Sequence, residues 1–118
     1  MAHILDVNDR AWLALKNKTK KIEIRATTNK DEFDYGKLMI NDLIIFTNSK
    51  NEKIDFQIKE INWYKSIEEL LIMEGTRYTL SSTNDFDEGV KSINSLTGYR
   101  DAICKNGVYA IHVEALFK

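Results

Sequence analysis

A chain of 118 residues is long enough for one domain with a single buried core, and no second domain is needed. Hydrophobic residues make up 43% of the sequence and charged residues 30%, which excludes an intrinsically disordered chain. The formal net charge is -1, so contact with nucleic acid would require a local group of basic residues rather than attraction by the whole protein.

Cysteine and histidine are scarce, which bears on location and on metal binding. The single cysteine, Cys104, cannot form an internal disulfide bond, as is typical of intracellular proteins. His3 and His112 stand at opposite ends of the sequence, so we expect neither a metal site nor a cofactor. No apolar run approaches the roughly 18 residues that suggest a membrane span. We therefore expect a cytoplasmic protein that does not contact a membrane.

The start of the chain predicts a strand followed by a helix. Residues 3–7 have the composition of a short strand, and Asn8 or Asp9 can cap a helix that runs from Arg10 to about Lys16. The residues of this helix that we expect to face inward are Trp12, Leu13 and Leu15.

The segment 20–25, which reads Lys-Lys-Ile-Glu-Ile-Arg, alternates apolar and ionised side chains. In an extended strand Ile22 and Ile24 share one face, while the side chains of Lys21, Glu23 and Arg25 share the other. The apolar face can anchor in a core, and the charged groups are then fixed on a stiff backbone, as a binding or catalytic site requires. The alternative is a strand whose charged face is simply solvated.

The middle of the chain predicts a hairpin. Residues 43–46 are a continuous apolar block, typical of a strand buried on both sides, and the polar residues 48–53 form a loop to a strand from Ile54 to about Tyr64. The apolar alternation in that strand changes phase near Lys59 and Glu60, which predicts a β-bulge.

Two further helices carry capping signals. Ser66 and Glu69 form a capping box for a short helix that stops at Gly75. Asp85 caps another helix, predicted for residues 86–96.

The end of the chain completes the sheet. We expect residues 99–106 to be irregular and residues 108–114 to form the last strand. A total of about five strands and three short helices favours an α+β domain, with a small curved or closed sheet and helices packed around its ends.

Several segments occur in an order that carries a resemblance to a known family. After the helix with Trp12 they cover residues 18–25, 40–46, 64–71 with 74–75, and 107–111. This ordered set resembles the ASCH domain family, whose pattern includes a glycine-lysine-lysine-threonine-isoleucine-glutamate-x-arginine run, a glycine-aspartate strand start and a closing glycine-valine-x-alanine-isoleucine strand. The resemblance covers nearly the whole chain and implies a single ASCH domain over residues 1–118.

The resemblance implies a PUA-like β-barrel of five to six strands with three short flanking helices, a cleft, and recognition of RNA or nucleosides. Small bacterial members include amidohydrolases that cleave N4-acetylcytidine to cytidine and acetate with a lysine, a threonine and a later glutamate. By position the lysine matches Lys20 and the glutamate matches Glu74, whereas Glu23 replaces the threonine. Two family glycines are also replaced, by Lys18 and Asn41.

These matches predict a hydrolase acting on a linear amide, with three catalytic residues. Lys20 would trade protons near neutral pH, with Lys21 as the substitute, and Glu23 would activate water. Glu74 would accept a proton or bind the cytosine amino group, and Arg25 would hold an oxyanion, a ribose or a phosphate. The prediction requires Lys20 and Glu74 to share one pocket, and it requires the strand to begin after Lys20, because otherwise Lys20 and Glu23 face opposite ways.

A second hypothesis is a module that binds single-stranded RNA or a modified nucleotide without turning it over. Positive charge would come from Lys18, Lys20, Lys21 and Arg25. Stacking platforms would come from Trp63, Tyr64, Tyr99 and Arg100. Core packing is the alternative for these residues and is the expectation for Trp63. A ribonuclease is a weaker third option, and the sequence leaves open the oligomeric state and whether the ligand is a base, a nucleoside or RNA.

Overall fold

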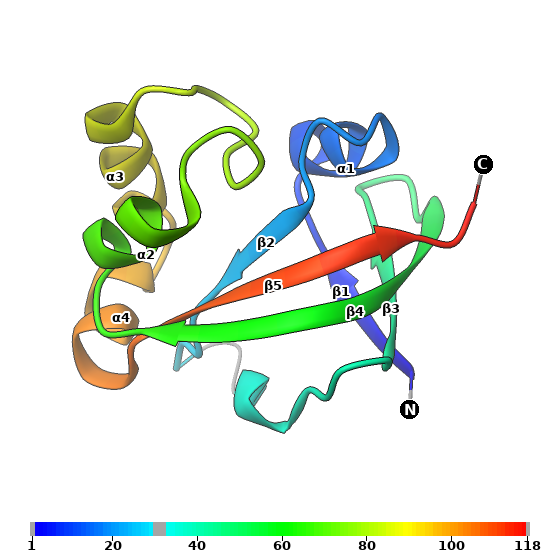
Figure 1. Ribbon diagram of the computed structural model, residues 1–118, viewed down its shortest axis with the longest axis horizontal. Coiled ribbons are helices and arrows are strands. Elements are labelled where there is room, and N and C mark those ends of the chain that lie inside the picture. Colours follow the sequence, from blue (N-terminus) through cyan, green and yellow to red (C-terminus); the bar gives the residue numbers. More distant parts are fainter. Residues whose placement is uncertain (1, 30–32, 118) are drawn as a thin grey trace.

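Five strands form one curled sheet, in the order β1-β3-β4-β5-β2, in the computed structural model, which describes residues 2–29 and 33–117. β1 runs parallel to β3, and the other neighbouring pairs are antiparallel. The long strands β4 and β5 run side by side through the molecule (Figure 1). The predicted α+β class, with a small barrel-like sheet and helices around it, is confirmed. The strands are β1 (Ala2–Asp6), β2 (Ile22–Arg25), β3 (Leu43–Thr47), β4 (Lys53–Tyr64) and β5 (Val108–Ala115).

The helices of the described residues begin mostly where the capping signals place them. The side chain of Asn8 accepts a hydrogen bond from the backbone N–H of Ala11 (2.8 Å), and the caps predicted at Ser66 and Asp85 are likewise formed. Each cap satisfies a backbone N–H that has no partner within its helix. The helices are α1 (Asp9–Lys16), α2 (Ile67–Glu74), α3 (Phe86–Asn94), α4 (Tyr99–Asn106) and the short 3-10 turn η1 (Tyr35–Lys37).

The prediction that residues 99–106 are irregular is wrong, because they form α4. This helix starts after Gly98, whose φ is +78°, and no side chain caps it. The sequence therefore lacks the Ser, Thr, Asp or Asn signal that marked the other helices. The chain has four α-helices among its described residues instead of the three expected.

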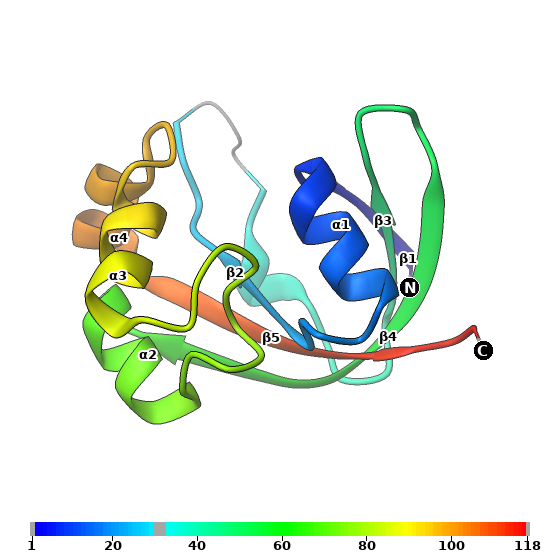
Figure 2. The same cartoon turned by 90° about the horizontal axis from the view of Figure 1, so that it is seen from above.

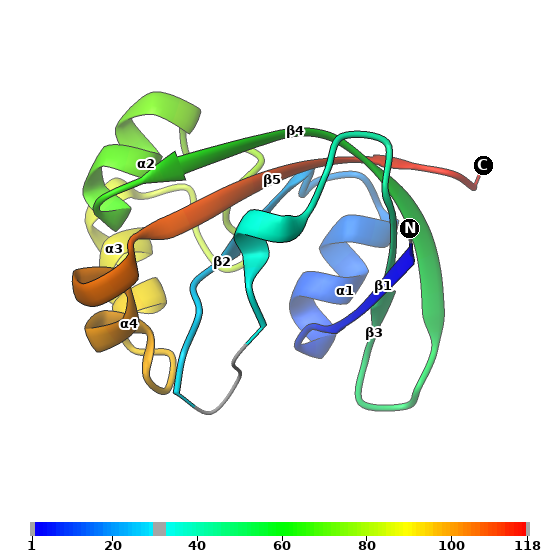
Figure 3. The same cartoon turned by 90° about the horizontal axis from the view of Figure 1, so that it is seen from below.

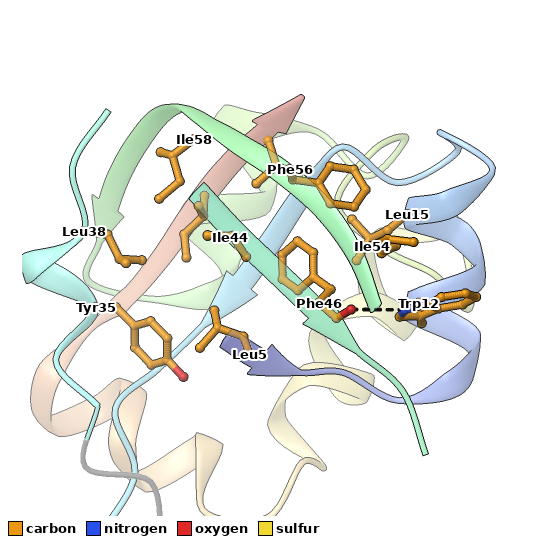
Figure 4. Packing of buried hydrophobic residues seen from close by; sticks show 12 residues of the cluster. Leu5, Trp12, Leu15, Tyr35, Leu38, Ile44, Phe46, Ile54, Phe56 and Ile58 are labelled. Carbon is orange, nitrogen blue, oxygen red and sulfur yellow. Dashed lines mark hydrogen bonds between the residues drawn. The ribbon is translucent and has the colours of Figure 1, made fainter. Parts of the chain in front are cut away.

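The sheet curls around α1, which packs between β2 and the β1–β3–β4 part of the sheet (Figures 2 and 3). Trp12 and Leu15 are buried here as predicted, and the indole Nε1 of Trp12 donates a hydrogen bond to the carbonyl oxygen of Phe46 (3.2 Å; Figure 4). Leu13 is 52% exposed, so its predicted inward orientation is wrong. Successive residues of a helix are rotated by about 100° around its axis. The core contacts the side of α1 that carries Trp12 and Leu15, and Leu13 points away from that side.

A second apolar cluster lies at the opposite end of the sheet, where α2, α3 and α4 gather (Figure 1). Ile22 and Ile24 of β2 are each 5% exposed and pack in this cluster with Leu70 and Leu71 of α2. The predicted apolar face of the charged strand is therefore confirmed. This anchoring fixes β2 and with it the direction of its charged side chains.

The predicted bulge in β4 is present, between Ile58 and Glu60. Ile58 pairs with Val113, but Glu60 rather than Lys59 pairs with His112. The extra residue thus changes which side chain faces His112 across the strand pair.

Lys18 and Asn41 have positive φ angles, of 64° and 76°. These are the positions where the resemblance implies glycine. Both turns therefore keep a backbone conformation that glycine would adopt without strain. A residue with a Cβ adopts it at a cost in free energy, and this cost is smaller for Asn than for most other residues.

Within the described part of the chain, none of the helices has both the length and the apolar character needed to cross a membrane.

Candidate active site

The backbone just before β2 places Lys20 on the same side as Glu23. β2 begins at Ile22, and the backbone N–H groups of Lys21 and Ile22 both donate to the carbonyl oxygen of Tyr78. Lys20 therefore lies outside the regular alternation of the strand. This is the condition under which the sequence predicted that Lys20 and Glu23 can enter one site.

The ammonium of Lys20 and the carboxylate of Glu23 form a buried ion pair. The Lys20 Nζ atom lies 3.5 Å from Glu23 Oε1 and donates a hydrogen bond of 2.6 Å to the carbonyl oxygen of Thr79. Lys20 is 5% exposed and Glu23 is 6% exposed. The alternative of a merely solvated charged face is thus wrong for Glu23.

Arg25 holds the other oxygen of Glu23. Its Nε and Nη2 atoms both lie 2.9 Å from Glu23 Oε2, and its remaining contacts are with the hydroxyl of Tyr35 and the carbonyl oxygen of Asp6. With Arg25 at Oε2 and Lys20 at Oε1, both oxygens of the Glu23 carboxylate are held by charged donors, which fixes its orientation. Most of the donors of Arg25 are thus engaged within the protein, and these contacts orient Glu23.

Burial and the neighbouring charges shift the pKa values of Lys20 and Glu23. Desolvation lowers the pKa of the Lys20 ammonium below its ordinary value, although the negative charge of Glu23 opposes that shift. Burial alone would raise the pKa of Glu23, but the positive charges of Arg25 and Lys20 outweigh it and lower the pKa. Glu23 is therefore held ionised, while Lys20 gives up its proton more readily than an exposed lysine.

Lys20, Glu23 and Arg25 line a common pocket of about 500 Å³. This volume lies in the range of small-molecule sites, roughly 300–1,000 Å³. The walls come from the start of α1, the loop after residue 78 and the end of α3. The polar and aromatic residues that share the lining include Asn8, Arg10, Thr79, Ser81, Ser82, Ser95 and Tyr99.

The other predicted ligand-binding residues are dispersed. Tyr99 lines the pocket and is half-buried, whereas Arg100 is exposed and is not among the lining residues. Lys21 is exposed and lies over the ring of Tyr78, at 4.7 Å, in a neighbouring pocket. Tyr64 donates its hydroxyl to Glu74 (2.6 Å) and packs against the second apolar cluster.

Glu74 is not in the pocket of Lys20. Its carboxylate contacts Asn62, Tyr64 and His112. Because His112 pairs with Ile22 whereas Glu23 pairs with Ile111, the side chains of His112 and Glu23 point to opposite faces of the sheet. The expected convergence of Lys20 and Glu74 on one pocket is therefore wrong, since α2 packs on the face opposite to Glu23.

Sequence reasoning missed most of the pocket wall. From the sequence, the segment from Leu80 to about Asn84 is a polar loop, and nothing in its spacing indicates that the carbonyl oxygen of the preceding Thr79 binds Lys20. Asn8 was found only as a helix cap. Residues that meet through long-range packing leave no local pattern.

No protein-family model matches the chain, and no curated protein matches it. Solved structures do. The crystal structure of hypothetical protein PH0355 matches with a TM-score of 0.82 and 27% sequence identity, covering 98% of this chain and 100% of that one. The solution NMR structure of protein PF0455 from Pyrococcus furiosus matches with a TM-score of 0.74 and 23% identity, covering 100% of both chains. These likenesses support the fold.

Proposed function

We propose that this chain is an ASCH-type amidohydrolase that removes the acyl group from N4-acylated cytidine or cytosine, with Lys20 and Glu23 as its catalytic pair. The observation that carries the proposal is the contact of 3.5 Å between Lys20 Nζ and Glu23 Oε1 in a pocket of about 500 Å³. A buried lysine with a lowered pKa and a charged partner in a cleft is typical of acid–base sites.

In the proposed reaction, Glu23 takes a proton from a water molecule as the water oxygen attacks the acyl carbonyl carbon. The ammonium of Lys20 gives a proton to the N4 atom as the carbon–nitrogen bond breaks, which leaves a free amine and a carboxylic acid. The proton on Glu23 then passes to Lys20 across their contact, and the pair is restored. Arg25 positions Glu23 throughout and keeps it ionised between turnovers.

The rest of the pocket suits a polar, planar ligand. The Tyr99 ring offers a surface for a base, while the hydroxyl groups of Ser81 and Ser82 and the guanidinium of Arg10 are available for the ribose or the acyl oxygen. This proposal differs from the three-residue prediction made from the sequence: it relies on Lys20 and Glu23 alone and assigns no catalytic role to Glu74, which lies on the other face of the sheet.

Incubation with N4-acetylcytidine, followed by ultraviolet absorbance and by acetate release, tests the proposal. We expect turnover by the wild type, and a loss of about 10²–10⁴-fold in kcat for Lys20→Met and for Glu23→Gln. Lys50→Met, at an exposed position, and Glu74→Gln should retain turnover. Circular dichroism establishes that each variant is folded. Absence of turnover in the wild type, or full turnover in folded Lys20→Met, contradicts the proposal.

A second candidate function is binding of single-stranded RNA or of a modified nucleotide without catalysis. It is favoured by a neighbouring pocket lined by Lys18, Lys21 and Arg77, which shares Ser81 and Ser82 with the first. Binding of this kind weakens as salt rises, by roughly 0.7 in log K per log salt for each phosphate contacted on a single strand. Salt-dependent RNA affinity without any product, lost in Lys21→Met, would favour this function. For either candidate the proposed location is the cytoplasm.

A further inference from the structure

Three potential metal ligands from distant parts of the sequence meet on the other face of the sheet. They are Glu60 of β4, Glu74 at the end of α2 and His112 of β5, and one ligand atom of each lies within 4.8 Å of the others. His112 Nε2 is 2.8 Å from Glu74 Oε1 and 3.4 Å from Glu60 Oε2.

The bulge in β4 assembles this cluster. Continued from the Ile58–Val113 pair, a regular ladder would place Lys59 opposite His112. The extra residue places Glu60 there instead, and Lys59 turns to Glu114, at 3.6 Å. The bulge thus exchanges a cation for a carboxylate beside the imidazole.

A layer of hydrogen bonds holds the two carboxylates in place. Asn62 Nδ2 donates to Glu60 Oε2 (2.7 Å) and to Glu74 Oε2 (2.8 Å), and the hydroxyl of Tyr64 also donates to Glu74 Oε2. These contacts leave Glu74 Oε1 directed at His112. Outer contacts of this kind orient metal ligands and are part of functional metal sites.

Within the part of the chain that the structure describes, no lysine or arginine balances the charge of the cluster. Among residues 2–29 and 33–117, no lysine or arginine forms an ion pair with Glu60 or Glu74, and His112 is their only recorded basic partner. The side chain of Glu74 is 7% exposed, that of His112 28% and that of Glu60 57%. The cluster is therefore anchored at its base and open to water on one side.

We propose that Glu60, Glu74 and His112 bind a divalent transition-metal ion, with Zn²⁺ as the best fit and water at the open position. One imidazole nitrogen and two carboxylate oxygens are ligands that Zn²⁺ accepts at about 2.0–2.2 Å, and three protein ligands plus water is its arrangement in open sites. Ligand atoms of a tetrahedral ion at these distances lie roughly 3.3–3.6 Å apart. The distance of 3.4 Å from His112 Nε2 to Glu60 Oε2 is already in this range. The distance of 2.8 Å from His112 Nε2 to Glu74 Oε1 would lengthen by about half an ångström on metal binding.

Binding also requires His112 to present a bare Nε2 atom, so the proton of the imidazole resides on Nδ1 in the bound state. The proposal does not depend on the amidohydrolase chemistry, because the two sites lie on opposite faces of the sheet. It adds a site that the sequence did not indicate, since His112 was expected to be without metal-binding neighbours.

Isothermal titration calorimetry and thermal unfolding with Zn²⁺, on tag-free protein carrying Cys104→Ser, test the proposal. The serine removes the exposed thiol as a competing ligand. We expect one Zn²⁺ ion per chain and a rise in Tm on adding Zn²⁺. The affinity should fall at least about 10-fold in Glu60→Gln and in His112→Gln, and Mg²⁺ should bind more weakly.

His3→Gln is the matched control, because His3 also contacts a carboxylate, that of Asp42 at 2.9 Å, but belongs to no three-ligand group among the described residues. It should leave Zn²⁺ affinity unchanged. Glu60 is exposed, so Glu60→Gln is expected to fold even if a variant at His112 does not. No saturable Zn²⁺ binding by the wild type, or equal affinity in Glu60→Gln and the wild type, would overturn the proposal.

Discussion

Lys20 and Glu23, three residues apart, form an ion pair of 3.5 Å in which each side chain is less than a tenth exposed. Most ion pairs of this type on protein surfaces contribute little to stability. A buried pair behaves differently, because removing one partner leaves the other charged and desolvated. This contrast gives a direct test of the cluster.

Glu23→Gln is expected to lower the free energy of unfolding by about 3–5 kcal/mol, since Lys20 and Arg25 then lose their shared anion. The double variant Lys20→Met/Glu23→Gln should lose less than the sum of the single variants. Urea denaturation of the four proteins measures the coupling. Additivity within about 0.5 kcal/mol would show that Lys20 and Glu23 do not interact.

As the pH is lowered, protonation of Glu23 should reduce the stability of the protein. Its folded-state pKa lies below the ordinary value of 4.5, because Arg25 and Lys20 outweigh the effect of burial. The unfolded chain therefore binds more protons in this window, and the stabilisation is complete above 4.5 and lost as the pH falls through the folded-state pKa. Denaturation curves below pH 4.5 should be less pH-dependent in Glu23→Gln than in the wild type or in the exposed control Glu114→Gln.

The phenol of Tyr64 should lose its proton at a higher pH than that of an ordinary tyrosine. Burial and the hydrogen bond to Glu74 raise the pKa of Tyr64 to about 12. Ultraviolet titration of tyrosinate should therefore contain a component near that pH that is absent from Tyr64→Phe. In Glu74→Gln the same component should move toward the ordinary value of 10.0. An unmoved component would mean that Glu74 does not contact the phenol.

Lys18→Gly should stabilise the protein, by about 1 kcal/mol, because φ at this position is +64°. Asn41→Gly, at φ +76°, is the matched comparison and should change stability by less than about 0.5 kcal/mol, since Asn tolerates this region. Lys18→Ala keeps the strained backbone and controls for loss of the side chain. A gain in Lys18→Ala equal to that in Lys18→Gly would assign the effect to the side chain instead.

Two glycines with the same φ of +79° separate backbone strain from steric overlap. Gly75→Ala should cost about 1–3 kcal/mol from strain alone, because a Cβ there meets nothing within 4 Å. At Gly107 a Cβ would lie 2.3 Å from Trp63 Nε1, which donates to the carbonyl oxygen of Asn106. Gly107→Ala should therefore cost about 1 kcal/mol more in thermal unfolding. Equal costs would show that the indole moves away freely.

Local signals in the sequence determined the fold class and most element boundaries. The caps at Asn8, Ser66 and Asp85 and the bulge beyond Ile58 were all predictable, because each depends on residues within a few positions of one another. α4 was not predictable in this way, since its start has a glycine and no capping side chain.

The composition of the candidate site was decided only by the tertiary structure. The alternation around Glu23 identified its charged face, but whether that face is solvated or buried depends on α1, α3 and the loop at Thr79 packing over it. Glu74 was assigned to the same pocket by its match to the later glutamate of the family pattern, and sequence order does not indicate on which face of the sheet its helix packs. The register between β2 and β5 sets that face, and it places Glu74 with His112 and away from Lys20.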